Sequence, residues 1–286
     1  MAEVSASMVK ELREMTGVGI LECKNALAEA DGDLNRAADI LREQGIAKQI
    51  KKAERAANEG TVVALVSEDG KSGSVIQLNC ETDFVAINDK FKAYAERIAQ
   101  IALANKCEDV DSLKAASDGS ESVEEIITDC VRVMGENTQL TKVASVSAGA
   151  VCAYIHAGGK IGVLVTFETE GIEPTSDAFV AYGRDVAMQV AAMSPVAANR
   201  ENVPADVVEH EMEIYKAQAA ESGKPEEIQQ KMAEGRLEKY YKESCLTEQE
   251  FVKNPDQTIK AYTEEVAKQL GGSIKVVDFI RFALGE

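Results

Sequence analysis

The sequence predicts an α+β protein with an N-terminal three-helix bundle, a core of two repeated subdomains with antiparallel sheets, and an inserted pair of antiparallel helices. Three observations carry this prediction. Apolar residues recur at helical spacing over the first 45 residues, a strand-turn-strand pattern occurs twice from residue 60 onward, and a charged helical stretch interrupts the second copy. Helices and strands that do not alternate regularly are typical of this class.

The first group of elements is expected within residues 1–55, where three short helices and a linker form a separate module. Glycines and capping side chains separate the helices at 16–19 and 31–33. The apolar faces comprise Val9, Leu12 and Met15, then Ile20, Cys23 and Leu27, then Leu34, Ala38 and Leu41. The charged stretch 48–59 is interpreted as a linker with a solvated helical face, and a basic binding patch is the alternative.

The core is expected to contain an internal repeat, with one subdomain over residues 60–146 and the other over residues 149–286. The two copies begin alike, as Gly-Thr-Val-Val-Ala-Leu-Val and Gly-Ala-Val-Cys-Ala-Tyr-Ile, and each turns at a Gly-Lys pair to form a β-hairpin. A helix follows each hairpin, and each half closes with a further strand, at 140–146 and at 274–282. Matching landmarks on the two helices are Phe91, Tyr94 and Ile98 in one, and Phe179, Tyr182 and Val186 in the other.

The second subdomain carries an insertion from about Pro204 to Leu246 that is nearly all helical and charged. Its apolar residues step by three and four, which predicts a seam between two helices. The turn between them reads Ser-Gly-Lys-Pro, with Gly suited to a helix end and Pro to a helix start. The seam residues are Val208, Met212, Tyr215 and Ala219, and Ile228, Met232, Leu237 and Tyr240. A projecting contact arm and a stabilising hairpin are both open interpretations.

The composition disfavours two classes of partner. With 31 Lys and Arg against 49 Asp and Glu, the chain carries a formal net charge of −18, which repels the phosphate backbones of nucleic acids. Aromatic residues make up 5% of the chain, so base-stacking surfaces are scarce. No apolar run approaches the ~18 residues of a membrane span, and the N-terminus shows no targeting pattern. We therefore expect a cytoplasmic protein that binds neither nucleic acid nor membranes directly.

Residues that bind metals or carry out covalent catalysis form no recognisable motif in the sequence. The cysteines lack a close pair for a zinc site or a redox dithiol, and neither His156 nor His210 has a cysteine or a second histidine nearby. The Gly-Gly-Lys turn at 158–160 leads through Ile161 into a strand, whereas a phosphate loop continues through Ser or Thr into a helix. We expect reduced thiols, no metal or cofactor, and a binding protein instead of an enzyme.

One short segment stands out because a large apolar side chain falls where a strand ends. Residues 80–86 read Cys-Glu-Thr-Asp-Phe-Val-Ala, and Asn88 and Asp89 then prepare the next helix. The aromatic residue, Phe84, is therefore expected in a loop. Two interpretations are open: Phe84 packs beneath its own hairpin as a core residue, or it points outward as an anchor for a partner.

This segment resembles the Thr-Asp-Phe-Val signature of the elongation factor Ts family, and residues 16–27 resemble the N-terminal signature of the same family. Further segments match in the same order along the chain: 154–156 with 162–165, 222–225, 234–236 and 279–282. The resemblance covers essentially the whole chain. Several spaced motifs in order make it more specific than any one motif.

The resemblance implies an architecture, an activity and a set of contact residues. The family has a three-helix N-terminal domain of the ubiquitin-associated (UBA) type, two related core subdomains and an antiparallel coiled-coil insertion. Its members are guanine-nucleotide exchange factors that bind elongation factor Tu in its GDP-bound and nucleotide-free forms. The residues at matching contact positions are Thr82, Asp83, Phe84 and Val85, then Ile20, Leu21 and Lys24, and His156. For His156, a satisfied strand histidine is the alternative.

The mechanism that the resemblance implies is indirect. The segment with Asp83 and Phe84 wedges against helices of the nucleotide domain of Tu, displaces the magnesium ion and loosens the phosphate-binding loop. Factor and GDP then bind with negative coupling. The alternative is an adaptor or scaffold, because small three-helix modules also occur in ubiquitin-type recognition proteins. The oligomeric state is open, and a homodimer is among the alternatives.

The chain departs from the family pattern in three places. Residues 137–142 replace paired arginines, Val252 and Lys253 replace an apolar pair that some members present to Tu, and the given sequence ends at Glu286 without the C-terminal module of some relatives. We therefore expect the partner contacts of these parts to be missing or replaced.

Overall fold

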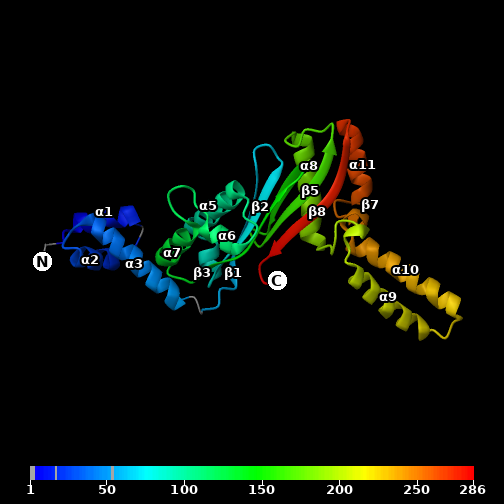
Figure 1. Ribbon diagram of the computed structural model, residues 1–286, viewed down its shortest axis with the longest axis horizontal. Helices are drawn as coiled ribbons and strands as arrows, with labels where there is room; N and C mark the ends of the chain where they lie inside the picture. Colours follow the sequence, from blue (N-terminus) through cyan, green and yellow to red (C-terminus); the bar gives the residue numbers. More distant parts are fainter. Residues whose placement is uncertain (1–3, 17, 53–54) are drawn as a thin grey trace.

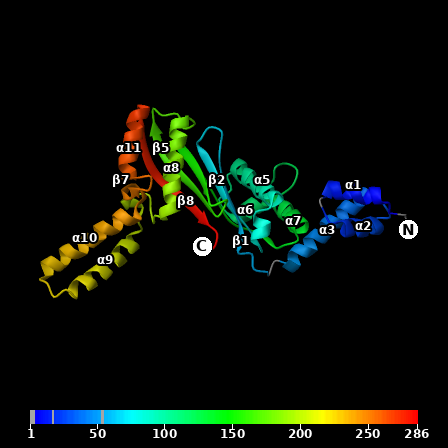
Figure 2. The ribbon, with the colours of Figure 1, turned by 180° about the vertical axis from the view of Figure 1, so that it is seen from behind.

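The computed structural model describes residues 4–16, 18–52 and 55–286. Figure 1 shows an elongated molecule with a group of N-terminal helices at one end, two sheets with their helices in the middle, and a helical hairpin at the other end. The view from behind in Figure 2 shows the same order. The combination of N-terminal helices with antiparallel sheets backed by helices confirms the α+β class.

The N-terminal helices are α1 (Ala6–Thr16), α2 (Ile20–Glu29) and α3 (Leu34–Lys52). The turn between α2 and α3 contains Asp31 and Gly32, whose φ angles of 50° and 87° lie in the left-handed region. Asp33 then accepts a hydrogen bond from the Arg36 amide at 2.9 Å, as a helix N-cap does. The helices share a core of Val9, Leu12, Val18, Cys23, Ala26, Leu27, Ala30, Ala37 and Leu41.

Three details of this region differ from the sequence prediction. Met15 and Ile20 were assigned to buried faces, yet both are 58% exposed. Met15 lies in the last turn of α1 and Ile20 in the first turn of α2, where the helices no longer cover each other fully. In addition, α3 continues to Lys52, beyond the three helices expected within the first 45 residues.

The first sheet contains β1 (Glu59–Val66), β2 (Ser72–Cys80) and β3 (Thr138–Ser147), in the order β1-β2-β3. Its helices are α5 (Asp89–Asn105), α6 (Val110–Ala115) and α7 (Val123–Met134). Ile76 and Leu78 of β2 pack with Phe91 and Ile98 of α5 in one buried core. β2 is buried along almost its whole length, because helices cover one face of the sheet and the second sheet covers the other.

The second sheet has the same arrangement, with β4 (Ala150–His156), β5 (Ile161–Glu170) and β8 (Ser273–Ala283) in the order β4-β5-β8. The helices α8 (Asp177–Met193) and α11 (Ile259–Leu270) accompany it. Smaller elements are β6 (Glu250–Phe251), β7 (Asn254–Thr258) and the 3₁₀ turns Arg200–Asn202 and Leu246–Glu248. Phe167, Phe179 and Tyr182 form the aromatic centre of this core.

The two sheets are joined by reciprocal contacts at equivalent positions of the repeat. The Val62 amide of β1 donates to the Gly159 carbonyl at 2.7 Å, and the Val151 amide of β4 donates to the Gly70 carbonyl at the same distance. Val62 and Val151 are buried in the core between the sheets, with Val75 and Leu164. Each hairpin turn therefore docks on the first strand of the other half.

The insertion forms the hairpin of α9 (Ala205–Ala220) and α10 (Glu226–Ser244). Along its length only Ala219 and Ala233 are buried, so most of the predicted seam residues are only partly covered. Its base is anchored more firmly. Arg200 donates to Glu238 and to Glu248, and Cys245 packs with Ala197 and Val203.

We expect that the distal part of this hairpin can be removed without unfolding the core. Replacing residues 213–236 by a short Gly-Ser linker keeps the anchored base, so the melting temperature of the core should shift by no more than about 4 °C. A longer deletion, from Pro204 to Leu246, should destabilise the core strongly because Cys245 and Leu246 are both 0% exposed. Calorimetry on the two variants checks this. Loss of the cooperative core transition in the short deletion would contradict it.

Candidate functional site

The chain turns sharply after β2, where the sequence predicted a loop. The turn is instead α4 (Asp83–Ala86), a single helical turn. Thr82 is its N-cap, because the Thr82 side chain accepts a hydrogen bond from the Val85 amide at 3.4 Å. Asp83 adds a carboxylate to the first turn, where a negative charge favours the helix.

Phe84 lies on the outside of this turn and is 78% exposed. Its neighbours divide between surface and core: Val85 packs partly against the first core, Ala86 is buried, and Ile87 is 67% exposed. The interpretation of Phe84 as a core residue is therefore wrong. Phe84 and Ile87 form an exposed apolar pair at the end of β2.

Several side chains form hydrogen bonds that fix the end of β2 and the turn after it. The Cys80 thiol donates to the Thr82 carbonyl at 3.2 Å, and burial raises the pKa of Cys80 to about 12, so the thiol stays protonated. Glu81 accepts from the Asn137 amide at 2.6 Å. Glu136 accepts from the amide and the hydroxyl of Thr82. The turn is therefore fixed to the connection between α7 and β3.

The predicted contact residues of the N-terminal helices lie on the outer side of α2. Ile20 is 58% exposed and Leu21 is 70% exposed, and Lys24 is also exposed. The opposite side of α2 buries Cys23 and other apolar residues in the small core. α2 therefore presents two apolar side chains and one cation to solvent.

His156 is the last residue of β4 and is exposed. Its Nδ1 atom lies 3.1 Å from the Tyr154 hydroxyl, and the Arg184 guanidinium lies over the Tyr154 ring at 5.9 Å. His156 is therefore an accessible surface residue with one polar partner. This geometry fits both interpretations, a contact residue and a satisfied strand histidine.

The predicted contact residues do not converge on one cleft. They belong to α2 in the N-terminal helices, to the turn at the end of β2 in the first sheet, and to the end of β4 in the second. Figure 1 shows α2 at the N-terminal end of the molecule, away from the two sheets. Such a distribution fits a large partner that covers several regions, and not a small substrate.

Comparison with known proteins decides the family. The sequence profile of the family described as Elongation factor TS matches residues 81–286. The chain belongs to the elongation factor Ts family. Two relatives called Elongation factor Ts, from Clostridium botulinum strain ATCC 19397 and Trichlorobacter lovleyi, are 46% and 45% identical to it, and each alignment covers 99% of this chain and 93% of the relative.

The matches to the elongation factor Ts family cover the three regions described above. Residues 81–286 contain Phe84 and His156, and the alignments with the two relatives extend over nearly the whole chain and so over most of the N-terminal helices. The sequence signals that found these residues were motif matches. Ile87 and Glu136 gave no such signal and are added by the structure.

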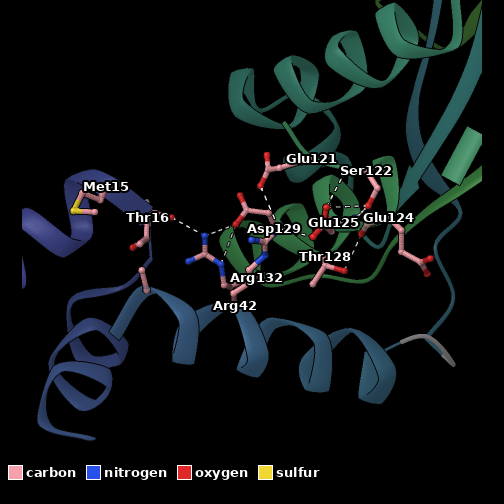
Figure 3. Close-up of a pocket in the computed structure, with 11 residues that line it drawn as sticks. Met15, Thr16, Arg42, Glu121, Ser122, Glu124, Glu125, Thr128, Asp129 and Arg132 are labelled. Carbon is pink, nitrogen blue, oxygen red and sulfur yellow. Dashed lines mark hydrogen bonds and ion pairs between the residues drawn. The ribbon is translucent and has the colours of Figure 1, made fainter. Parts of the chain in front are cut away.

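A cavity at the junction of α1 and α3 with α7 has a volume of about 690 Å³, and Figure 3 shows the side chains that line it. Its charged side chains bind one another: Arg42 contacts Glu125 at 2.5 Å, and Arg132 pairs with Asp129 and donates to the Thr16 carbonyl at 2.9 Å. These bonds join the N-terminal helices to the first subdomain. The cavity is therefore better explained as a polar contact between the N-terminal helices and the first subdomain than as a ligand site.

Within residues 4–16, 18–52 and 55–286, no group of three His, Cys, Asp or Glu side chains is arranged to hold a metal ion. In the same ranges, no helix is both long and apolar enough to cross a membrane. All six cysteines are free and buried.

Proposed function

We propose that this chain is the guanine-nucleotide exchange factor of elongation factor Tu. The observation that carries the proposal is the exposure of Phe84 on a capped and braced turn, in a chain of the elongation factor Ts family. An exposed aromatic side chain on such a turn is suited to fill a pocket of a partner protein. This activity needs no covalent chemistry, so in this proposal the chain is a binding protein and not an enzyme.

The proposed mechanism uses the turn as a wedge. Asp83 and Phe84 insert against helices of the nucleotide domain of Tu, the magnesium ion is displaced, and the phosphate-binding loop loses its hold on GDP. The same partner surface includes Thr82 and Val85. Because binding free energies are reciprocal, GDP weakens the binding of the factor as much as the factor weakens the binding of GDP. Excess GTP then refills the site and releases the factor.

The remaining predicted residues serve as secondary contacts in this proposal. One group of contacts lies on α2 and comprises Ile20, Leu21 and Lys24, and a separate contact, His156, lies on β4. Tu would therefore be bound by several regions at once. We further infer that α1–α3 form a UBA-like bundle, that α9 and α10 form an antiparallel coiled coil, and that the protein acts in the cytoplasm without direct contact to nucleic acid.

A kinetic experiment separates this function from that of a scaffold. Tu loaded with a fluorescent GDP is mixed with substoichiometric amounts of the chain and with excess unlabelled GDP. An exchange factor accelerates the release of the labelled nucleotide and turns over, whereas an adaptor binds without changing the rate. Binding with an unchanged release rate would refute the proposal.

Replacing Lys24 by glutamate should slow association with Tu by about threefold or more at low salt, because reversing an interface charge acts mainly on the association rate. The effect should shrink as salt is raised, since exposed charges are screened over about 8–10 Å at physiological ionic strength. Stopped-flow association at two salt concentrations measures it. The control is Lys10→Glu on α1, which makes the same change of charge at another exposed lysine. Equal effects of the two substitutions would show that Lys24 contributes only net charge.

A further inference from the structure

The turn that carries Phe84 cannot be stable by itself. α4 has only four residues, and its helical hydrogen bonds run from Ala86 to Thr82 at 3.2 Å and from Ile87 to Asp83 at 3.0 Å. Isolated helices of this length do not form in water, because nucleation fixes several residues for one bond. The position of Phe84 must therefore be set by contacts from outside the turn.

Glu136 supplies the most direct of these contacts. It follows α7 and the left-handed Gly135, whose φ is 79°. One carboxylate oxygen accepts the Thr82 amide at 3.0 Å, and the other accepts the Thr82 hydroxyl at 2.7 Å. Hydrogen bonds to a charged acceptor are stronger than those between neutral groups. A single side chain therefore holds both the backbone and the side chain of the residue that starts the turn.

The direction of these bonds explains why a carboxylate suits this position, since it accepts both of them. The Thr82 hydroxyl donates its proton to Glu136, so its oxygen lone pairs are free to accept the Val85 amide as the N-cap. Such a chain of bonds polarises the hydroxyl and strengthens the cap. Glutamine has one acceptor oxygen, so it could accept only the Thr82 backbone amide, and its NH2 group would have to donate to the Thr82 hydroxyl. The hydroxyl would then no longer donate to residue 136, and its oxygen would be shared between two donors, which weakens the N-cap.

Asn137 reinforces the same connection on the other side of β2. Its backbone amide donates to the Glu81 carboxylate at 2.6 Å, and its side-chain amide donates to the Arg55 carbonyl at 2.7 Å. Glu81 also pairs with the Arg55 guanidinium at 3.5 Å. These bonds hold the end of β2, whereas the amide and the hydroxyl of Thr82 are bound by Glu136. The two residues thus act on adjacent points of the chain.

We propose that Glu136 is a positioning residue for nucleotide exchange: it fixes the turn of Thr82 and Val85 so that Phe84 is presented outward in one orientation. The inference rests on the proposed function. Glu136 acts through Thr82 and does not itself contact the reacting nucleotide. Loss of the Glu136 carboxylate should lower the maximal rate of GDP release. The concentration of factor needed for half-maximal effect should change little, because α2 and His156 still bind the partner.

The test compares Glu136→Gln with the wild-type chain in fluorescent GDP release from Tu over a range of factor concentrations. We expect the maximal rate to fall about tenfold, equivalent to 1.4 kcal/mol, with less than a twofold change in the half-saturating concentration and an unchanged melting temperature. Glu108→Gln is the matched control, since Glu108 is an exposed glutamate in the loop before α6. It should behave as wild type.

Two further measurements identify positioning as the cause. Thr82→Val removes the hydroxyl that donates to Glu136 and should lose at least as much exchange as Glu136→Gln. In a Phe84→Ala background, Glu136→Gln should lower the exchange rate by less than about twofold more, because both substitutions remove the same contribution, that of the Phe84 side chain. Full additivity, or normal exchange by Glu136→Gln, would overturn the inference. A wild-type chain that does not accelerate release would instead refute the proposed function.

Discussion

Phe84→Ala should lower the rate of GDP release from Tu by more than about tenfold and leave the melting temperature of the chain almost unchanged. Truncating an aromatic anchor of an interface typically costs ~2 kcal/mol or more of binding, and each 1.4 kcal/mol of lost transition-state stabilisation is a factor of ten in rate. Because Phe84 is 78% exposed, its removal takes little buried area from the folded chain. Fluorescent nucleotide release and calorimetry on the same sample measure the two effects.

Phe91→Ala is the control with the same change of side chain. Phe91 is 0% exposed, in α5, so its truncation should cost ~3–5 kcal/mol of folding free energy. Exchange per folded molecule should remain normal. The two substitutions, seven positions apart, should thus impair different properties: Phe84→Ala the exchange rate and Phe91→Ala the stability of the fold. A large melting shift for Phe84→Ala with normal exchange would show that Phe84 supports the fold instead.

Gly183→Ala should destabilise the second subdomain even though alanine is the better helix former. The added Cβ would lie 2.1 Å from the sulfur of Cys152 and 2.7 Å from its Cβ, where β4 approaches α8 most closely. Overpacking of this kind costs ~1–3 kcal/mol, against a propensity gain of ~1 kcal/mol. We expect a lower melting temperature by several degrees, measured by calorimetry.

Gly235→Ala in α10 is the opposite case and serves as its control. A Cβ at Gly235 would meet no atom within 4 Å, so only the helix propensity changes and the hairpin should gain ~0.5–1 kcal/mol. In the double variant Gly183→Ala with Cys152→Ala, the closer clash is removed and part of the loss should be recovered. Equal effects of the two glycine substitutions would contradict the packing explanation.

Much of the fold could be predicted because its signals are local or repeated. The two hairpins were found from their similar opening residues, and the breaks between the N-terminal helices from glycines and capping residues. Periodicity, however, gives the direction of a side chain and not what covers it. For this reason Met15 was assigned to a core although it is 58% exposed at a helix end.

The candidate site could be predicted only in part. The motif at 80–86 located Phe84, but a sequence cannot show whether an aromatic residue after a strand points inward or outward. Glu136 lies 54 positions from Thr82 in the chain, so no local pattern links them. The end of α3 was also missed, because the helix continues through Gly45 to Lys52, and glycine more often stands at the end of a helix than inside it.

The reciprocal contact between the two hairpins also constrains the order in which the protein can fold during synthesis. The first sheet leaves the ribosome before the second, with Val62 and Val75 facing solvent until Val151 and Leu164 arrive to cover them. β8 adds Ile280 and Phe282 to the same layer. The apolar face of the nascent first half is therefore covered in part when β4 and β5 emerge and completely only after β8, and during this interval it is exposed to aggregation.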